Sequence, residues 1–338
     1  MTVRQIAYLS DRPEVLAETH AYVRHFMPWL THVVVVTPRR TAKAMVDLSL
    51  SPDAMVLTDE ELIEPGTDLA ALDHQTRNLL LRLGLSRSHA VDDVFLSSDD
   101  DYRPLKALTE ERFVRMGADG REKLAGFTFY DLLDWTADAT DFDRGQQNSL
   151  QVLAYLGAEQ RAYASHMPQA VDKQVFVEAV AMARTVAPSI PLCEWAVYGN
   201  LGRKIAPERF AQPEPHLTLA WPEYPNQWRR AVVPREYAFE NFYPQLYEPG
   251  HLFAGLPTAL DVTRVEQDAV EKLLRWRRLD LAIRRLDVPD DLVSPWATSS
   301  RLRKAYFRAL RPARKTLDLL MLGERAADHT SILPTDTP

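Results

Sequence analysis

Short apolar runs alternate with amphipathic segments along the first hundred residues. Four runs have the length and β-branched or aliphatic content of buried strands, namely residues 6–9, 32–37, 54–57 and 94–97. Residues 14–29 carry apolar side chains along one helical face, and Pro28 should end that helix. Residues 69–83 also follow a helical pattern, with Gly84 expected as the C-cap. The order strand, helix, strand, strand, helix, strand predicts crossover connections between parallel strands.

The second half of the chain is less regular. Residues 126–130 and 151–156 are expected to be further sheet or buried elements, and a helix is expected from 171 to 184. A helical pattern returns from Thr263 onward. We therefore expect an α/β fold with a mostly parallel sheet flanked by helices and a helical C-terminal extension. Two domains are predicted, a catalytic domain over 1–255 and the extension over 256–338.

Composition narrows the kinds of site that the chain can build. The sequence has 12 glycines, and neither Gly-x-Gly-x-x-Gly nor Gly-x-x-x-x-Gly-Lys occurs, so neither standard glycine-rich phosphate cradle is present. Gly-x-Ser-x-Gly and His-Glu-x-x-His are also absent, which argues against a serine hydrolase of that type and a zinc protease. Cys193 is the single cysteine, so the chain forms no internal disulfide and no cysteine-based zinc site.

Charge is unevenly distributed. The chain carries −7 overall, and residues 301–315 hold seven basic residues and no acidic one, which leaves −14 for the remainder. An acidic body argues against nucleic-acid binding. Residues 301–322 also carry apolar positions, so this segment is either a helix packed on the main domain or an interfacial helix on an anionic membrane. With neither a signal peptide nor an apolar run long enough for a bilayer, the expected location is cytoplasmic, with peripheral contact at the inner membrane face under the second alternative.

Three consecutive carboxylates, Asp99, Asp100 and Asp101, directly follow the apolar run 94–96. Adjacent carboxylates repel one another, and a cation would relieve the repulsion. Oxygen ligands suit Mg²⁺ or Mn²⁺, and the alternate positions Asp99 and Asp101 are the candidate metal ligands. The competing interpretation is a solvated acidic turn. In open α/β sheets, ligands bind at the carboxyl ends of strands, so the loop Ser10 to Arg12 should lie at the same edge.

A strand followed by Asp-x-Asp, about 100 residues into such a domain, resembles the nucleotide-sugar glycosyltransferases of the GT-A fold. The helix-like stretch 72–83 (Leu-Asp-His-Gln-Thr-Arg-Asn-Leu-Leu-Leu-Arg-Leu) and residues 95–104 (Phe-Leu-Ser-Ser-Asp-Asp-Asp-Tyr-Arg-Pro) also resemble the Stealth-type sugar-phosphate transferases. The second resemblance departs from its family where Asn-Asp-Asp has Ser98 or Asp99 in place of Asn, and the opening Thr-Trp-Val-Asp-Gly is absent.

The resemblance implies roles for residues outside the triplet. Ser10, Asp11 and Arg12 would hold the nucleoside, and Asp100 would contact the donor. Arg77 and Arg82, on the helix before the triplet, either clamp a phosphate or lie on a solvated helix face, and the solvated face is the favoured alternative for Arg82.

Three later residues are also implicated. His166, in Ser165-His166-Met167-Pro168, would bind metal or phosphate or assist phosphoryl transfer, and Lys173 would add positive charge toward a diphosphate. Glu194 stands in an apolar stretch and would be the general base on the acceptor hydroxyl. For each of the three, a purely structural role is the alternative.

These expectations combine into a Mn²⁺- or Mg²⁺-dependent glycosyltransferase that moves a sugar from a nucleotide-sugar donor to a glycan or lipid-linked acceptor, as in polysaccharide biosynthesis. Two alternatives stay open. One is a Stealth-like transferase that moves a sugar phosphate and releases a nucleoside monophosphate, and the other is a non-catalytic nucleotide-sugar-binding module.

Overall fold

The computed structural model describes residues 2–129, 141–163, 167–215, 218–219 and 238–285. Its strands are β1 Gln5–Leu9, β2 His32–Thr37, β3 Met55–Thr58, β4 Val94–Asp99, β5 Tyr102–Pro104, β6 Val114–Met116, β7 Glu122–Leu124, β8 Thr128–Phe129, β9 Gln169–Asp172, β10 Glu214–Pro215, β11 Thr218–Leu219 and β12 Phe239–Asn241. Its α-helices are α1 Pro13–Phe26, α2 Arg39–Asp47, α3 Asp59–Leu62, α4 His74–Arg87, α5 Asp141–Tyr155, α6 Lys173–Val186, α7 Glu194–Ile205 and α9 Val265–Arg285.

A five-stranded sheet in the order β3-β2-β1-β4-β9 organises the fold. The first four of these strands are mutually parallel, and β9 runs antiparallel to β4. The chain moves outward from β1 to β2 and β3 and then returns to place β4 on the other side of β1. Strand order therefore reverses between β1 and β4, and such a switch point leaves a crevice at the carboxyl ends of the two strands.

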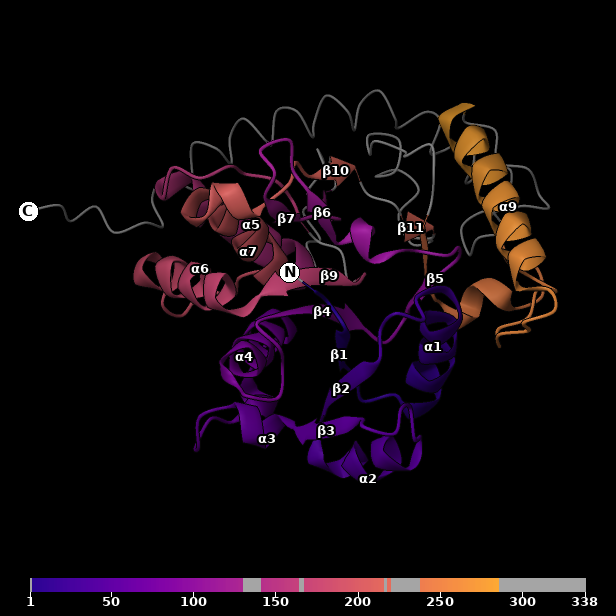
Figure 1. The fold of residues 1–338 in the computed structure, drawn as a ribbon, viewed down its shortest axis with the longest axis horizontal. Coiled ribbons are helices and arrows are strands. Elements are labelled where there is room, and N and C mark those ends of the chain that lie inside the picture. The colour runs from indigo at the N-terminus through magenta and orange to yellow at the C-terminus, as the bar shows by residue number, and fades with distance from the viewer. Residues whose placement is uncertain (1, 130–140, 164–166, 216–217, 220–237, 286–338) are drawn as a thin grey trace, which may run out of the picture.

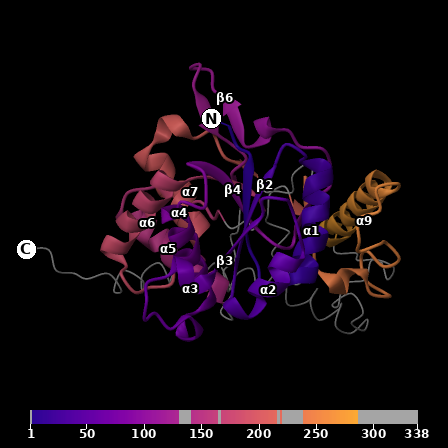
Figure 2. The same ribbon diagram turned by 60° about the horizontal axis from the view of Figure 1, so that its bottom comes forward.

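Helices cover both faces of this sheet, as the sequence predicts. Figure 2 shows α1 on one side of β2 and β4, and α4 to α7 on the other. In Figure 1, α9 stands beyond α1 at the far end of the molecule from α6. The prediction of an α/β fold with a mostly parallel sheet flanked by helices is confirmed.

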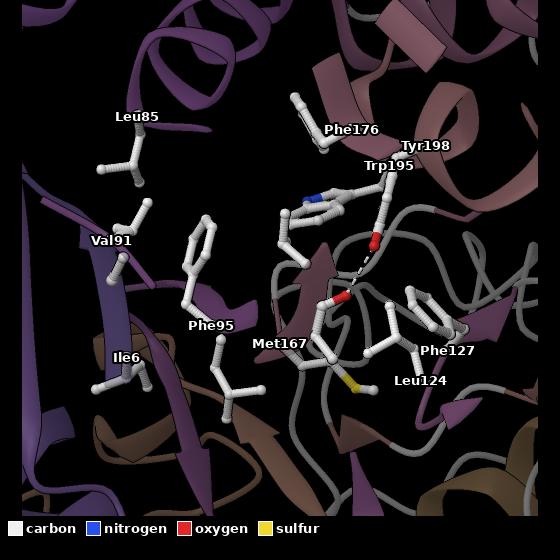
Figure 3. Close-up of a cluster of buried hydrophobic side chains, with 14 of the residues drawn as sticks. Ile6, Leu85, Val91, Phe95, Leu124, Phe127, Met167, Phe176, Trp195 and Tyr198 are labelled. Atoms are coloured by element: carbon white, nitrogen blue, oxygen red, sulfur yellow. Dashed lines mark hydrogen bonds between the residues drawn. The ribbon is translucent and has the colours of Figure 1, made fainter. Parts of the chain in front are cut away.

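The main core surrounds the sheet and includes residues of α1 and α2 as well as of α4 to α7. Figure 3 shows Phe95 of β4 and Trp195 and Tyr198 of α7 within this cluster of buried apolar side chains. The Tyr198 hydroxyl donates a hydrogen bond to the carbonyl oxygen of Ala170 over 3.3 Å, so this large ring brings its polar end into the core with a partner.

Some local predictions were wrong. Helix α4 continues through Gly84 to Arg87, so Gly84 is no C-cap. A Cβ at Gly84 would lie 2.2 Å from the carbonyl oxygen of Leu62, so glycine is needed there for the close approach of α3 and α4. Helix α2 was not predicted. Residues 151–155, expected to be sheet or another buried element, form the end of helix α5, in which Val152 and Leu153 are buried as expected.

Helix α9 packs on a second core cluster, which includes Leu105, Phe242 and Trp276. The Lys272 ammonium donates to Glu240 Oε2 over 2.7 Å, and both side chains are almost completely buried. The first part of the predicted C-terminal extension is thus helical and held to β12 by a buried ion pair. The domain boundary at 255/256 stays a prediction. No helix among the described residues is long and apolar enough to cross a bilayer.

Candidate active site at the switch point

The switch point brings together the two loops that the sequence predicted to meet. Leu9 pairs with Asp99 across β1 and β4, so the residues after both strands lie at one edge. The Ser10 hydroxyl donates to Asp100 Oδ2 over 2.5 Å. The Arg12 guanidinium donates to Asp100 Oδ2 over 3.1 Å and to Asp101 Oδ2 over 2.9 Å. The acidic triplet is therefore tied to the first loop by charge-assisted hydrogen bonds and is not a freely solvated turn.

Asp100 is the most deeply buried of the three carboxylates, at 3% exposed. Burial raises the pKa of Asp100 to about 6, although the hydrogen bond from Arg12 acts in the opposite direction. Burial alone would lower the pKa of Arg12, but the hydrogen bond and negative charge of Asp100 raise it. Arg12 is thus a fixed cation between Asp100 and Asp101.

A cleft of about 270 Å³ opens at this edge. It follows the carboxyl ends of the parallel strands, from the acidic triplet after β4 to Asp59 after β3. Its lining consists of Leu9, Ser10, Asp11, Arg12, Val36, Pro38, Asp59, His74, Arg77, Asn78, Leu81, Asp99, Asp100 and Asp101. The combination of apolar walls and convergent charged groups is typical of a small-molecule site.

One wall of the cleft is a face of helix α4. His74, Arg77, Asn78 and Leu81 are spaced at i, i+3, i+4 and i+7, so they share that face, and all four line the cleft. The helix begins at an N-cap, Asp73, whose carboxylate accepts a hydrogen bond from the backbone N–H of Thr76 over 2.9 Å. Arg77, the predicted phosphate clamp, is therefore placed where it can contact a ligand in the cleft.

Arg82 lies on α4 one turn after Asn78. It was expected in solvent and is instead buried, at 2% exposed. Its Nε donates to Glu194 Oε1 over 3.1 Å and its Nη1 to the Ser97 hydroxyl over 2.6 Å, while Nη2 donates to Asp99. The guanidinium also lies 4.7 Å from the ring centroid of Trp195. Burial alone would lower the pKa of Arg82, but Asp99 and Glu194 raise it, so the arginine stays charged.

Glu194, the predicted general base, is the first residue of α7 and is 4% exposed. Its carboxylate is bound to Arg82, and it is not among the residues that line the cleft. Among the described residues, Arg82 bridges Glu194 to Asp99, which does line the cleft. Its geometry is that of a residue that positions Arg82.

Asp99 and Asp101 fit a divalent cation of a particular kind. Both side chains lie at the cleft, and each is 16% exposed. In the described part of the chain, no group of three or more His, Cys, Asp or Glu side chains is arranged to hold a metal ion. The described residues thus offer at most two carboxylates to one ion here. Mg²⁺ is commonly held by one or two carboxylates together with water and substrate phosphates, so this donor set fits a metal that arrives with a phosphorylated ligand.

One predicted site residue, Lys173, lies away from the cleft. Lys173 pairs with Asp93 over 3.0 Å, next to Val94 at the amino end of β4, whereas the cleft lies at the carboxyl end of that strand. The two ends of β4 are about 17 Å apart. Its assignment as a diphosphate contact was therefore wrong, since it faces the opposite edge of the sheet. His166 and the basic segment 301–322 lie outside the described residues.

The sequence analysis missed three polar residues of the cleft, namely Asp59, His74 and Asn78. His74 and Asn78 could have been found, because they share a helical face with Arg77 and precede the strand that leads to the triplet. Asp59 follows a predicted strand just as Ser10 and Asp99 do. The carboxyl ends of all the parallel strands were therefore the signal to follow.

Comparisons with known proteins do not identify a function for this site. No protein-family model and no curated protein matches the chain. Among solved structures, the crystal structure of an active-site mutant of LgtC matches with a TM-score of 0.41 and 11% sequence identity, over 79% of this chain and 95% of the LgtC chain. A likeness at this level carries no argument about activity, so we base the function on the chain's own residues.

Proposed function

We propose that this protein is a metal-dependent glycosyltransferase that uses a nucleotide-sugar donor, as its resemblance to GT-A enzymes implies. The observation that carries the proposal is the position of the acidic triplet. Asp99 to Asp101 end a central strand at the switch point of a mostly parallel sheet, inside a cleft whose wall also presents Arg77. Carboxylates for a cation next to arginines for an anion are the combination that a metal-bound diphosphate requires.

Asp99 and Asp101 would hold Mg²⁺ or Mn²⁺, and the ion would neutralise the negative charge that develops on the leaving diphosphate. Arg82 fixes the orientation of Asp99 through its buried hydrogen bond. Ser10 and Arg12 fix Asp100 in the same way from the other loop. The acidic groups are therefore preorganised from two sides of the cleft, which lowers the reorganisation needed when the donor binds.

Arg12 and Arg77 would bind the oxygens of the diphosphate. Arg12 has the geometry for this role because 47% of its side chain is exposed while its guanidinium stays anchored to Asp100 and Asp101. The acceptor that we propose is a glycan or lipid-linked hydroxyl compound. The resemblance assigned its deprotonation to Glu194, but the buried bond to Arg82 favours a positioning role for that carboxylate.

The test is incubation of the full chain with a panel of nucleotide sugars and Mn²⁺ or Mg²⁺, followed by chromatography of the nucleotide product. Slow transfer to water reveals the bond that breaks even without the natural acceptor. We expect a nucleoside diphosphate, formed only with metal and not in the presence of a chelator. A nucleoside monophosphate would instead identify a sugar-phosphate transferase. Absence of any product, together with no metal-dependent thermal shift, would indicate a binding module.

A further inference from the structure

Asp59 is a buried carboxylate at the far end of the cleft from the acidic triplet. It directly follows β3, lines the cleft and is 7% exposed. Among the described residues it takes part in no hydrogen bond or ion pair. Burying a carboxylate without a partner costs free energy, which a ligand that donates hydrogen bonds would recover.

The charges around Asp59 do not neutralise it. Arg77 and Arg40 attract the carboxylate, while Glu60 and Asp11 repel it. Burial is the largest influence and raises the pKa of Asp59. The nearest arginine on the cleft wall, Arg77, therefore lies close enough to act with Asp59 on one ligand but does not form an ion pair with it.

The position of Asp59 along the sheet indicates which part of a ligand it meets. The cleft spans β4, β1, β2 and β3 in that order. Three strand spacings amount to about 14 Å. That length suits an extended nucleoside diphosphate better than a sugar phosphate. With the diphosphate beside Asp99 and Asp101, the ribose would lie over β1 and β2 and the base would reach Asp59.

We propose that Asp59 reads the nucleobase by accepting a hydrogen bond from a ring N–H, which selects uracil, thymine or guanine over cytosine or adenine; this rests on the proposed function. Uracil, thymine and guanine carry a protonated ring nitrogen on the Watson–Crick edge, flanked by a carbonyl. Cytosine and adenine have an unprotonated nitrogen there. An ionised carboxylate is only an acceptor, so it pairs with the first group and repels the second.

The neighbouring side chains of α4 fit the same bases. Asn78 has two amide N–H donors, so it can bond the carbonyl beside the ring N–H, while Arg77 is left to the diphosphate. The Asn78 amide lies 3.1 Å from His74 Nε2, which fixes its place on the wall. The Asp59 carboxylate, which accepts, and the Asn78 amide on α4, which donates, are thus complementary to a ring N–H flanked by a carbonyl. Leaving a buried polar group unpaired is what makes such a site reject the wrong base.

The experiment measures the dissociation constants of UDP, CDP, GDP and ADP for the full chain with Mg²⁺ at neutral pH, by calorimetry. UDP is compared with CDP and GDP with ADP, because each pair is matched in size. We expect UDP or GDP to bind at least about tenfold more tightly than its matched partner. In Asp59→Asn, whose amide both donates and accepts, the ratio should fall to about threefold or less.

Glu60→Gln is the matched control, because it removes the adjacent negative charge from an exposed side chain outside the cleft. Its base preference should equal that of the wild type. Thermal unfolding checks that both variants fold. If Asp59→Asn does not fold, equal binding of UDP and CDP and of GDP and ADP by the wild type would still overturn the proposal.

Two outcomes would overturn the proposal and leave the proposed function standing. One is equal affinity for both nucleotides of each pair, and the other is a preference for UDP or GDP that persists in Asp59→Asn. Asp59→Asn could instead weaken the binding of all four nucleotides by the same factor. If 2′-deoxynucleotides lose the same factor with the wild type, Asp59 binds the ribose and not the base. Failure of every nucleotide to bind would overturn both the inference and the proposed function.

Discussion

Arg82 Nε donates to Glu194 Oε1 over 3.1 Å, and the two side chains are 3% and 5% exposed. The same guanidinium binds Asp99 at the cleft, so one buried arginine joins a cleft carboxylate to the start of helix α7. Two carboxylates that would otherwise be costly to bury thereby share one cation. The position of Asp99, and with it the shape of the proposed metal site, depends on a residue that does not itself line the cleft.

Glu194→Gln should therefore act mainly on stability and on the metal site. Removing one partner of a buried ion pair costs about 3–5 kcal/mol, and we expect the lower end because Asp99 remains bound to Arg82. Chemical denaturation measures the loss, with the exposed Glu208→Gln as control, expected within about 0.5 kcal/mol of the wild type.

Activity separates the two roles considered for Glu194. As a positioning residue, its loss should raise the metal concentration needed for half-maximal turnover and leave the pH profile of kcat in place. Abolition of kcat at saturating metal, with little loss of stability, would instead restore Glu194 as the general base.

Asp101→Asn should abolish metal-dependent turnover of the nucleotide sugar. The substitution removes one of the two carboxylates proposed for the cation and also the ion pair with Arg12, which measures 2.9 Å. Turnover in a Mn²⁺ or Mg²⁺ titration measures the effect, and Asp53→Asn, in the exposed turn before β3, is the control with the same change of charge. Full metal-dependent activity in Asp101→Asn would show that the metal assignment is wrong.

His20 should make the protein sensitive to mild acid. Its Nε2 lies 3.1 Å from the Leu50 carbonyl oxygen and must donate to it, so Nδ1 accepts from the Tyr8 hydroxyl over 3.3 Å and the ring is neutral. Burial lowers the pKa of His20 to about 4. Between this value and about 6.5 the unfolded chain binds the proton and the folded chain does not, so this contribution is complete above pH 6.5 and lost as the pH falls toward 4.

The expected loss from His20 is about 3 kcal/mol across that range. Denaturant unfolding at several pH values measures it as a slope, and His20→Gln should flatten the slope. His25→Gln, which removes an exposed histidine from the same helix, is the control. An unchanged slope in His20→Gln would contradict the assignment.

Lys272→Met should destabilise the contact between α9 and β12. Lys272 and Glu240 form a buried ion pair, and the Tyr247 hydroxyl also donates to Glu240. Leaving Glu240 without its cation should cost about 3–5 kcal/mol in denaturant unfolding, and replacing both residues by methionine should recover at least half of that.

Glu271→Gln weakens a partly exposed pair with Arg275 on the same helix and serves as control, with an expected effect of about 0.5 kcal/mol. A Lys272→Met effect as small as the control would show that the ion pair does not hold the helix.

The sequence was sufficient for the four parallel strands of the sheet and for one end of the site, but it did not predict the antiparallel strand β9. Strand β2 was predicted with its observed bounds, and β1, β3 and β4 were predicted within two residues at each end. These strands are readable because each is a short run of β-branched or aliphatic residues, a local property. Parallel strands have their carboxyl ends at the same edge of the sheet, so the meeting of Ser10 and Arg12 with the triplet followed without coordinates.

Tertiary structure decided what each polar side chain does. Arg82 looked like a solvated helix residue because its partners Asp99 and Glu194 lie 17 and 112 positions away in the chain. Lys173 looked like a cleft residue, but β9 runs antiparallel to β4 and delivers it to the opposite edge. Periodicity tells which face of an element is apolar, whereas the burial and partners of a charge depend on which other elements pack there. Asp59 is the clearest case, since only the packing of α3 against α4 makes it a buried carboxylate in a cleft.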